Sequence, residues 1–330
     1  MSTQASSFNV SLRGDTANKL FLVPFYQDLQ PMEMDIFDIM TNVVNKKRMM
    51  YAGTLGNFLR KKTKCGFEAS GRVEITERTI SVEIIKGETE ECWADFENSI
   101  LMELRRKGNN LGDLTGTVMH QIMLERMTQG AANQVNEIVF FGDMTSGNAD
   151  INLIDGLWTR LIPELEAHQK LITIDSNSGT PLQPGEAIEL LDAVYKSASN
   201  QLKGTPEQDR RMIVSNNICE QVEEDLRANV AGDRIFVQIL ENGRRLLRFR
   251  GIPIIPMLRW QDLYEKHLGV SDANLVLYTT VRNLVIATDA QDSMMEIRSW
   301  YNNEDDVVRN RLTFKLGFNY VHDSFMVAAK

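Results

Sequence analysis

Histidine and cysteine are the side chains most able to act as general bases, nucleophiles or metal ligands, so their spacing bears first on any chemistry. The four histidines stand far apart in the sequence: His120, His168, His267 and His322. None lies at metal-ligand spacing from a cysteine or another histidine. His120 stands beside an apolar helical stripe, where we expect a packed core imidazole and not a ligand. The spacing predicts no metal site.

The three cysteines, Cys65, Cys92 and Cys219, form no CxxC pair and are odd in number. They predict reduced thiols in a cytoplasmic setting and no disulfide framework. Cys219 follows Ser215 and Asn216, either of which can cap a helix, and no general base is indicated beside it. We expect Cys219 to pack as a small apolar residue and not to act as a nucleophile.

Motifs that hold phosphates or catalytic metals are absent from the sequence, which has no GxxxxGKS/T, GxGxxG, HExxH or GxSxG pattern. The nearest match is GFEASGR, Gly66–Arg72, which lacks the Lys-Ser/Thr pair and precedes a strand. The acidic run Glu304–Asp306 lacks the glycine and distal glutamate of a calcium loop and predicts a solvated turn. With 45 Asp and Glu residues, no acid–base pair stands out. We therefore predict no catalytic, cofactor-binding or metal residue, and a protein that is not an enzyme.

Basic residues occur in runs, although the formal net charge of the chain is -9. That charge argues against a protein whose main task is to grip a phosphate backbone. The runs either form solvated faces or contact acidic surfaces on other copies of the chain. We choose the second alternative as the prediction. Inter-subunit contacts are expected at Arg60, Lys61, Lys62, Lys64, Arg72, Glu74, Glu77, Arg78, Arg244 and Arg245.

Composition indicates a folded chain, because 43% of its 330 residues are hydrophobic and 25% are charged. This length allows two or three compact units. The first ten residues, MSTQASSFNV, lack the basic and apolar regions of a secretory signal. No stretch approaches the roughly 20 apolar residues that span a bilayer. We expect a protein that stays out of membranes and is soluble until it assembles.

The first 92 residues predict extended structure that needs support. Residues 1–45 are polar or mixed and predict an arm, with a short helix within Asp28–Met40. Apolar alternation at 73–75 and 80–84, separated by the polar stretch Thr76–Thr79, predicts a β-hairpin that turns at that stretch. Because a lone hairpin is marginal in water, it should pack on its own domain or on another subunit.

Two helices are expected next, over 94–107 and from a cap at Asp113 to Phe141. The second carries an apolar residue every fourth position: Met119, Met123, Met127, Ala131 and Val135. About 26 residues rising 1.5 Å each make a helix roughly 39 Å long. Such a helix can form the backbone of an elongated subunit, and Gly142-Asp143 should end it.

Residues 160–290 alternate between helical and strand patterns and predict an α/β unit. One strand, Arg244–Arg250, leads into GIPIIP, whose prolines Pro253 and Pro256 argue against a central strand. Other strands are expected at 211–214, 274–278 and 283–288, and at least two more follow position 295.

This order of elements resembles the major capsid proteins of tailed bacteriophages, which have the Hong Kong 97 fold. The resemblance covers nearly the whole chain as a pattern, and no single motif is diagnostic. The segments that carry it are NEIVFFGD (136–143), DGLW (155–158), LLDAVYKSASNQL (190–202), MIVSNNICEQVEEDL (212–226), RFRGIPIIP (248–256) and RNRLTFKLGFNYVHDSFMVAA (309–329).

The resemblance implies an α+β, Hong Kong 97-like capsid fold with a long spine helix, an extended β-hairpin (the E-loop), a peripheral domain and an axial α/β domain. The chain would then divide into an N-terminal arm (1–49), the E-loop hairpin (50–93), a peripheral domain with the spine helix (94–160), an axial domain (161–290) and C-terminal strands returning to the peripheral domain (291–330).

The implied function is that of a coat protein. Copies would assemble through pentamers and hexamers into an icosahedral head that encloses double-stranded DNA without reading its sequence. Portal and scaffolding or decoration proteins would be partners, no membrane or cofactor would take part, and the protein would reside in the virion after assembly in the host cytoplasm. No Lys-Asn crosslink is expected, because no partner asparagine can be matched to Lys61, Lys62 or Lys64.

Two alternatives remain open at this point. An encapsulin-like compartment shell would share the fold, and a cytoplasmic α/β enzyme could be built on residues 160–290. Under the capsid hypothesis, deleting residues 66–86 is expected to leave soluble subunits or capsomers and no closed shell.

Overall fold

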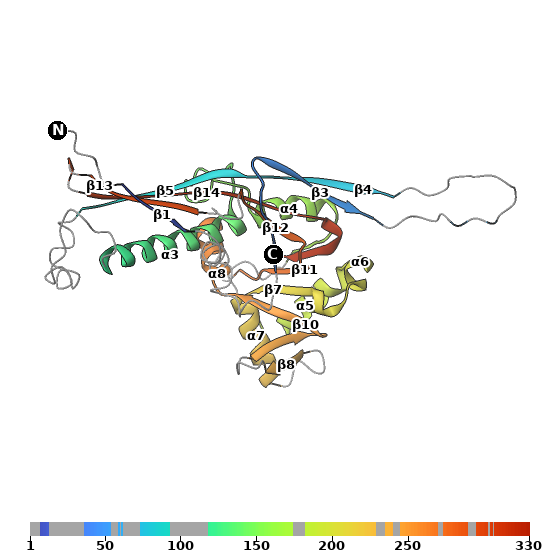
Figure 1. Cartoon of the computed structure of the whole chain (residues 1–330). Helices are drawn as coiled ribbons and strands as arrows, with labels where there is room; N and C mark the ends of the chain where they lie inside the picture. Colours follow the sequence, from blue (N-terminus) through green and yellow to red (C-terminus); the bar gives the residue numbers. More distant parts are fainter. Residues whose placement is uncertain are drawn as a thin grey trace.

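The computed structural model describes residues 7–12, 36–53, 59, 61, 73–92, 118–173, 182–228, 235–239, 245–269, 273–289, 295–302, 304–305 and 307–330. These ranges form a six-stranded sheet, a seven-stranded sheet and a separate two-stranded sheet (Figure 1). The described chain contains both helices and strands, as expected from the sequence.

The elements have the following bounds. The helices are α3 (Val118–Phe141), α4 (Leu157–Ala167), α5 (Glu186–Ser197), α6 (Asn200–Gly204), α7 (Asn216–Arg227) and α8 (Trp260–Leu268), with short 3-10 turns η2 (Glu207–Asp209) and η4 (Asp323–Phe325). The strands are β1 (Ser7–Leu12), β2 (Phe37–Met40), β3 (Lys46–Ala52), β4 (Ile75–Ser81), β5 (Glu83–Cys92), β6 (Leu171–Ile172), β7 (Arg210–Ser215), β8 (Ile235–Ile239), β9 (Arg245–Phe249), β10 (Ile252–Met257), β11 (Val276–Thr280), β12 (Leu284–Ala287), β13 (Met295–Asn302), β14 (Val307–Tyr320) and β15 (Met326–Ala329).

The six-stranded sheet is built around β14, a strand of 14 residues. Its order is β1-β13-β14-β12-β2, and β5 pairs with β14 beside this path. Residues of β14 alternate between a buried side with Leu312 and Phe314 and an outer side with the exposed Arg311, as a strand with one covered face requires. The apolar side faces α3, which runs beneath this sheet (Figure 1).

The two-stranded sheet, which we call the ribbon, consists of β3 and β4 in antiparallel register. The stretch Thr76–Thr79 lies inside β4, so the turn predicted there is wrong. Period-two alternation identified the strand but not its partner, which comes from residues 46–52 earlier in the chain. β4 continues through Val82 into β5, so one extended segment runs along the top of the molecule from the ribbon to the six-stranded sheet (Figure 1).

A glycine permits this extended segment to cross the six-stranded sheet. A Cβ added at Gly317 of β14 would lie 2.1 Å from the carbonyl oxygen of Ser81, at the end of β4. Any side chain at position 317 would therefore push the ribbon away from the sheet.

The seven-stranded sheet has the order β6-β15-β11-β7-β10-β9-β8. The GIPIIP run forms β10 inside this order, so the expectation that Pro253 and Pro256 exclude a central strand is wrong. The strand changes partner along its length: Ile252 and Pro253 pair with β9, whereas 254–257 pair with β7. Each part of β10 thus forms sheet hydrogen bonds mainly on one side. A proline, which has no N–H to donate, can therefore occupy a position where no bond from the N–H is needed.

Two apolar cores lie on opposite faces of the seven-stranded sheet. Met212 and Val214 of β7 pack in a core with α5 and α7, while Ile213 between them packs in the larger core on the other face. That larger core also contains residues of α3, α4 and α8 and of the six-stranded sheet. A single core therefore joins the two sheets.

Strands near both ends of the chain belong to the two large sheets. β2, within the predicted N-terminal arm, is an edge strand of the six-stranded sheet and pairs parallel with β12. Residues 37–40 therefore form a strand and not part of the helix expected within Asp28–Met40. β15, near the C-terminus, pairs with β11 and β6 of the seven-stranded sheet. The predicted helix over 94–107 lies outside the described residues.

The long helix is present as α3, 24 residues that end at Phe141, and its C-terminal residues Val135 and Ile138 are buried. The Gly142-Asp143 pair follows the helix, as predicted. No helix in the described part of the chain is long and apolar enough to cross a bilayer.

Candidate interaction surfaces

The ribbon has one face that packs on the rest of the molecule and one that does not. In an antiparallel pair, directly opposed residues point to the same side. The inner face carries the pairs Met49–Arg78 and Lys47–Ile80, and the outer face carries Arg48–Thr79, Met50–Glu77 and Ala52–Ile75. These two faces are the starting point for any contact with a partner.

The inner face is anchored first by apolar packing. Met49 and Ile80 are 6% and 0% exposed, and they form a small core with Val285 and Ala287 of β12. At about 25 cal/mol per Å², burying two such side chains contributes a few kcal/mol. The base of the ribbon is therefore held to the six-stranded sheet.

Arg78 makes the main polar contact of the inner face. Its guanidinium donates two hydrogen bonds to the Glu164 carboxylate of α4, one of them 3.1 Å long. The same group lies 4.2 Å from the centre of the Tyr320 ring at the end of β14. A planar guanidinium suits both partners, because it can bond a carboxylate with two N–H groups while it stacks on a ring.

Tyr51 makes an aromatic contact at the same face. Its ring centre lies 4.6 Å from that of His322 and 5.5 Å from that of Phe325. Phe325 ends the turn η4, which connects β14 to β15, and His322 is the cap residue just before it. Thus each strand of the ribbon has its own contact with the body of the molecule.

The outer face presents large apolar side chains to solvent. Met50 is 67% exposed and Ile75 is 60% exposed, and they flank an ion pair of 3.5 Å between Arg48 and Glu77. Exposed apolar residues that gather along one face, beside both signs of charge, are typical of a protein-contact surface. The described ribbon thus has a free face fit for a partner.

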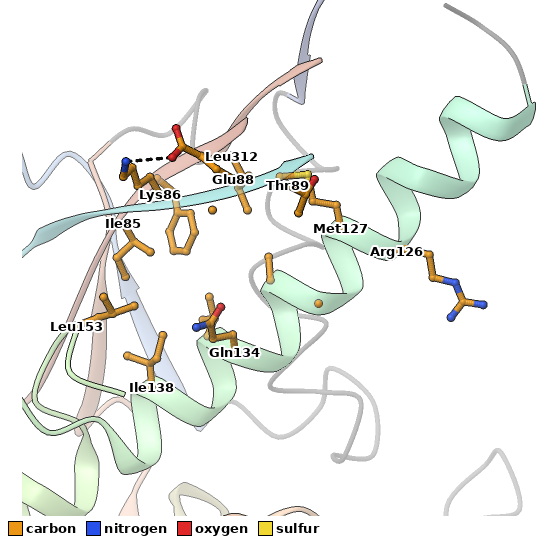
Figure 2. Close-up of a pocket in the computed structure, with 15 residues that line it drawn as sticks. Ile85, Lys86, Glu88, Thr89, Arg126, Met127, Gln134, Ile138, Leu153 and Leu312 are labelled. Carbon is orange, nitrogen blue, oxygen red and sulfur yellow. Dashed lines mark hydrogen bonds and ion pairs between the residues drawn. The ribbon is translucent and has the colours of Figure 1, made fainter. Parts of the chain in front are cut away.

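A groove opens between α3 and the six-stranded sheet. Its volume is about 420 Å³, and it is lined from α3 by Met127, Ala131 and Ile138 and from β14 by Leu312 and Phe314 (Figure 2). Gly87 and Gly130 contribute no side chains to its walls. The groove is mostly apolar, while Arg126 projects away from it at its rim (Figure 2). Sequence reasoning found the helical stripe but not this groove, because the sheet strands that complete it are distant in sequence.

The outer side of the six-stranded sheet carries a ladder of charge pairs. Arg311 bonds Glu88 at 2.8 Å and Arg309 bonds Glu90 at 2.7 Å, each pair facing across β14 and β5. A hydrogen bond from Lys86, joined by Arg311, lowers the pKa of Glu88. These residues alternate with a period of two in the sequence, but only the register shows that they meet.

The expected inter-subunit residues separate into three groups. Lys61, Glu74 and Glu77 are exposed, and Glu77 pairs within the chain with Arg48. Arg78 forms hydrogen bonds with Glu164 and stacks on the ring of Tyr320, both within its own chain. Arg245 begins β9, with no described side chain, and the others lie outside the described residues: Arg60, Lys62, Lys64, Arg72 and Arg244.

One cluster places a serine, a histidine and an aspartate together. The Ser324 hydroxyl lies 2.5 Å from His322 Nδ1, and an Asp323 oxygen lies 3.3 Å from the same nitrogen. A general base needs its nucleophile and its orienting carboxylate on opposite ring nitrogens. Here the Nδ1 atom also accepts the Ser324 backbone N–H at 3.0 Å, so His322 caps the turn η4. The arrangement suits a structural cap and not nucleophilic catalysis.

Cys219 has the inert character expected for it. Burial, together with Glu223 and Glu220, raises the pKa of this thiol to about 12. It packs at the edge of the core beneath α7. Among the described residues, no group of three or more His, Cys, Asp or Glu side chains is placed to hold a metal ion.

Comparison with known proteins shows similarity in structure and none in sequence family. No family model matches the chain, and no curated protein matches it. A chain of the procapsid of satellite phage P4 superposes with a TM-score of 0.56 at 11% identity, over 95% of this chain and 98% of that one. The capsid chain of a native GTA particle gives 0.54 at 10% identity, over 100% and 94%.

A third similar structure is not a virus. A chain of the holo-SrpI encapsulin complex from Synechococcus elongatus PCC 7942 gives a TM-score of 0.54 at 10% identity, over 93% of this chain and 94% of that one. At these identities the likeness is one of fold. The chain therefore has the fold of phage capsid proteins, as its order of elements indicated, and an encapsulin shares this fold.

Proposed function

We propose, from the premise that this chain has the capsid fold, that it is the major coat protein of a tailed bacteriophage. Many copies would assemble through pentamers and hexamers into an icosahedral head around double-stranded DNA. The observation that carries the proposal is the extent of the likeness: it spans 95% of this chain and 98% of the P4 procapsid chain, with no large domain left over on either side.

The elements then take the following roles. α3 is the spine helix, the ribbon is the E-loop, and the six-stranded sheet with α3 is the peripheral domain. The seven-stranded sheet with α5 and α7 is the axial domain that packs around the capsomer axis. Portal and scaffolding or decoration proteins complete the particle, and assembly takes place in the host cytoplasm.

The outer face of the ribbon is proposed to lie on a neighbouring copy. Met50 and Ile75 are exposed in the single chain, so covering them removes apolar surface from water in the assembled shell. A contact between two different surfaces is heterologous, and repeating it by rotation closes a ring. The net charge of -9 suits a wall that encloses DNA without binding it tightly.

Assembly tests the proposal directly. Size-exclusion chromatography with light scattering, followed by negative-stain images, should give shells or rings of five and six subunits, with scaffolding protein added if the chain alone stays dispersed. Met50→Lys with Ile75→Lys should leave a folded subunit that forms no shells. Met144→Lys, at a residue 54% exposed outside the ribbon, is the matched control and should assemble normally. Dispersed monomers that form no shell under any of these conditions would refute the shell function.

These two substitutions replace the deletion expected from the sequence. Removing residues 66–86 would take away β4 and the first four residues of β5, which pair with β3 and β14. Such a deletion would damage the subunit itself, so a failure to assemble would say nothing about a contact surface.

An encapsulin-like compartment is the second candidate, because the SrpI encapsulin chain is as similar as the GTA capsid chain. The contents of particles from the native source distinguish the two. Particles that protect double-stranded DNA from nuclease support the phage head. Particles that contain a co-purifying enzyme and no DNA support the compartment.

A further inference from the structure

We infer that the ribbon is held against the body by an acid-sensitive latch, in which neutral His322 fixes the turn on which Tyr51 rests. The latch comprises Tyr51 and Arg78 of the ribbon with Glu164, Tyr320 and His322 of the body. The inference does not rest on the proposed function, because it concerns how one subunit holds its own ribbon.

The latch lies beyond the apolar anchor of the ribbon. Met49 and Ile80 bury the middle of the inner face, whereas Tyr51 lies one step farther toward the ribbon's free end on β3. Because Tyr51 touches only His322 and Phe325 among the described rings, its contact depends on where the turn η4 places those two residues. The position of η4 therefore affects the direction of the ribbon.

The position of η4 in turn depends on the protonation state of His322. Its Nδ1 atom accepts from the Ser324 backbone N–H at 3.0 Å, which is possible only while that nitrogen carries a lone pair. On the far side of the turn, the Ser324 carbonyl oxygen accepts from the Ser199 hydroxyl at 2.6 Å. Two hydrogen bonds therefore hold Ser324 in place: one from Ser199, the cap residue of α6, and one to neutral His322.

Protonation gives His322 a different partner. A proton on Nδ1 cannot share that position with the Ser324 N–H, and its nearest possible acceptors are the Ser324 hydroxyl oxygen at 2.5 Å and the charged Asp323 Oδ1 at 3.3 Å. The imidazolium would turn toward Asp323, the cap on Ser324 would be lost, and the rings of His322 and Phe325 would leave Tyr51. The two protonation states thus favour two arrangements of one turn.

The charges around His322 come from each element packed against it. Burial lowers its pKa first of all; Asp323 of the turn and Glu164 of α4 raise it, and Arg78 of the ribbon and Lys170 lower it further. His168 faces the same Asp323 at 3.8 Å. Because the folded chain prefers neutral His322, the stabilisation is present above the unfolded pKa of about 6.5 and is lost as the pH falls through the lowered pKa.

Thiol labelling at the inner face measures the latch. Met49→Cys places a thiol where only 6% of the residue is exposed. Its reaction with dithiodipyridine is followed by mass spectrometry on the full chain, and the rate at each pH is divided by the rate in urea. Between pH 7.5 and pH 5.0 this ratio should rise severalfold, because the latched form disfavours the proton on His322 that the open form binds.

Two variants of His322 make the test specific. His322→Asn keeps a side-chain acceptor for the Ser324 N–H but removes one of the two rings that Tyr51 contacts. Because it cannot titrate, labelling at position 49 should be the same at both pH values, whatever its absolute rate. His322→Ala removes the acceptor, so labelling should be fast at both. Acid-dependent labelling that persists unchanged in His322→Asn, or no acid dependence in the parent chain, would overturn the inference.

A second readout avoids the cysteine substitution. Hydrogen exchange of the Ser324 amide, expressed as a protection factor, should fall between pH 7.5 and pH 5.0 in the native chain and stay constant in His322→Asn. Equal protection at both pH values in the native chain would also reject the latch.

Discussion

The backbone N–H of Gly156 donates to the carbonyl oxygen of Gly142 over 2.8 Å, so the turn that ends α3 and the turn that begins α4 are in direct contact. A Cβ at Gly156 would lie 2.7 Å from the Gly142 nitrogen and from the Ile138 carbonyl oxygen. The two motifs around these glycines stood apart in the sequence, and the fold makes them one joint between two helices.

Gly156→Ala should destabilise the chain by about 3 kcal/mol, because its methyl group meets backbone atoms that cannot move independently of α3. Urea denaturation gives the free energy of unfolding. Gly130→Ala in α3 is the control: no atom in the described part of the chain lies within 4 Å of its Cβ, and a helical Gly→Ala change should stabilise by up to about 1 kcal/mol. Equal effects of the two substitutions would contradict the tight joint.

Arg78→Ala should lower the free energy of unfolding by about 1–3 kcal/mol, since it removes a half-buried ion pair with Glu164 and the contact with Tyr320. Arg48→Ala is a matched control on the opposite face of the same ribbon. Its pair with Glu77 is exposed on both sides, so its removal should change stability by less than about 0.5 kcal/mol. If Arg48→Ala lowered the free energy of unfolding as much as Arg78→Ala, the inner and outer faces of the ribbon would contribute equally to stability, and this prediction would be wrong.

Glu137→Gln should destabilise the contact between α3 and α8. The Glu137 carboxylate is buried and accepts from Lys266 at 2.6 Å and from His267 at 2.5 Å. Burial raises its pKa, but these hydrogen bonds outweigh burial and hold the pKa below its usual value of 4.5. The stabilisation is therefore present above about pH 4.5 and is lost as the pH falls through the lowered pKa.

Stability curves from pH 7 to about pH 3 test this pair. At pH 7 the Gln variant should be about 1–3 kcal/mol less stable, and the difference should shrink toward acid. Asp150→Asn is the control, because Asp150 is 59% exposed in its side chain and lies 4.0 Å from the same Lys266. A Gln variant with the stability of the native chain at pH 7 would refute the role of Glu137.

Cys219 should resist thiol reagents in the folded chain. With a pKa of about 12, almost no thiolate is present at pH 8, and the side chain is packed under α7. Mass spectrometry should find this cysteine labelled at the rate of global unfolding. Cys219→Ala should leave assembly unchanged, and rapid labelling of native Cys219 would instead mark an activated thiol.

The sequence by itself determined the local structure of much of this protein. The apolar stripe of α3, the glycine that follows it, and the alternation of arginine with apolar residues in β9 are properties of neighbouring residues, so they could be predicted without a structure. The order of these elements was also enough to indicate the capsid fold. Cys219 was predicted to pack as a small apolar residue, and it packs against the core that lies under α7.

Only the tertiary structure decided which of these elements meet. Alternation predicted a turn at Thr76–Thr79, where the structure has a strand. It could not say that Arg78 would pair with Glu164 of its own chain while Glu77, on the opposite face, stayed exposed. The prolines of β10 were expected to exclude a central strand. That expectation was wrong because a proline loses a sheet hydrogen bond only where a neighbouring strand would accept from its N–H, and the neighbour of β10 changes along its length. The spacing of apolar residues along a helix or strand is set by backbone geometry within that element. Which elements pack together is set by contacts between segments far apart in sequence. A single sequence therefore specifies the type of an element much more directly than its neighbours.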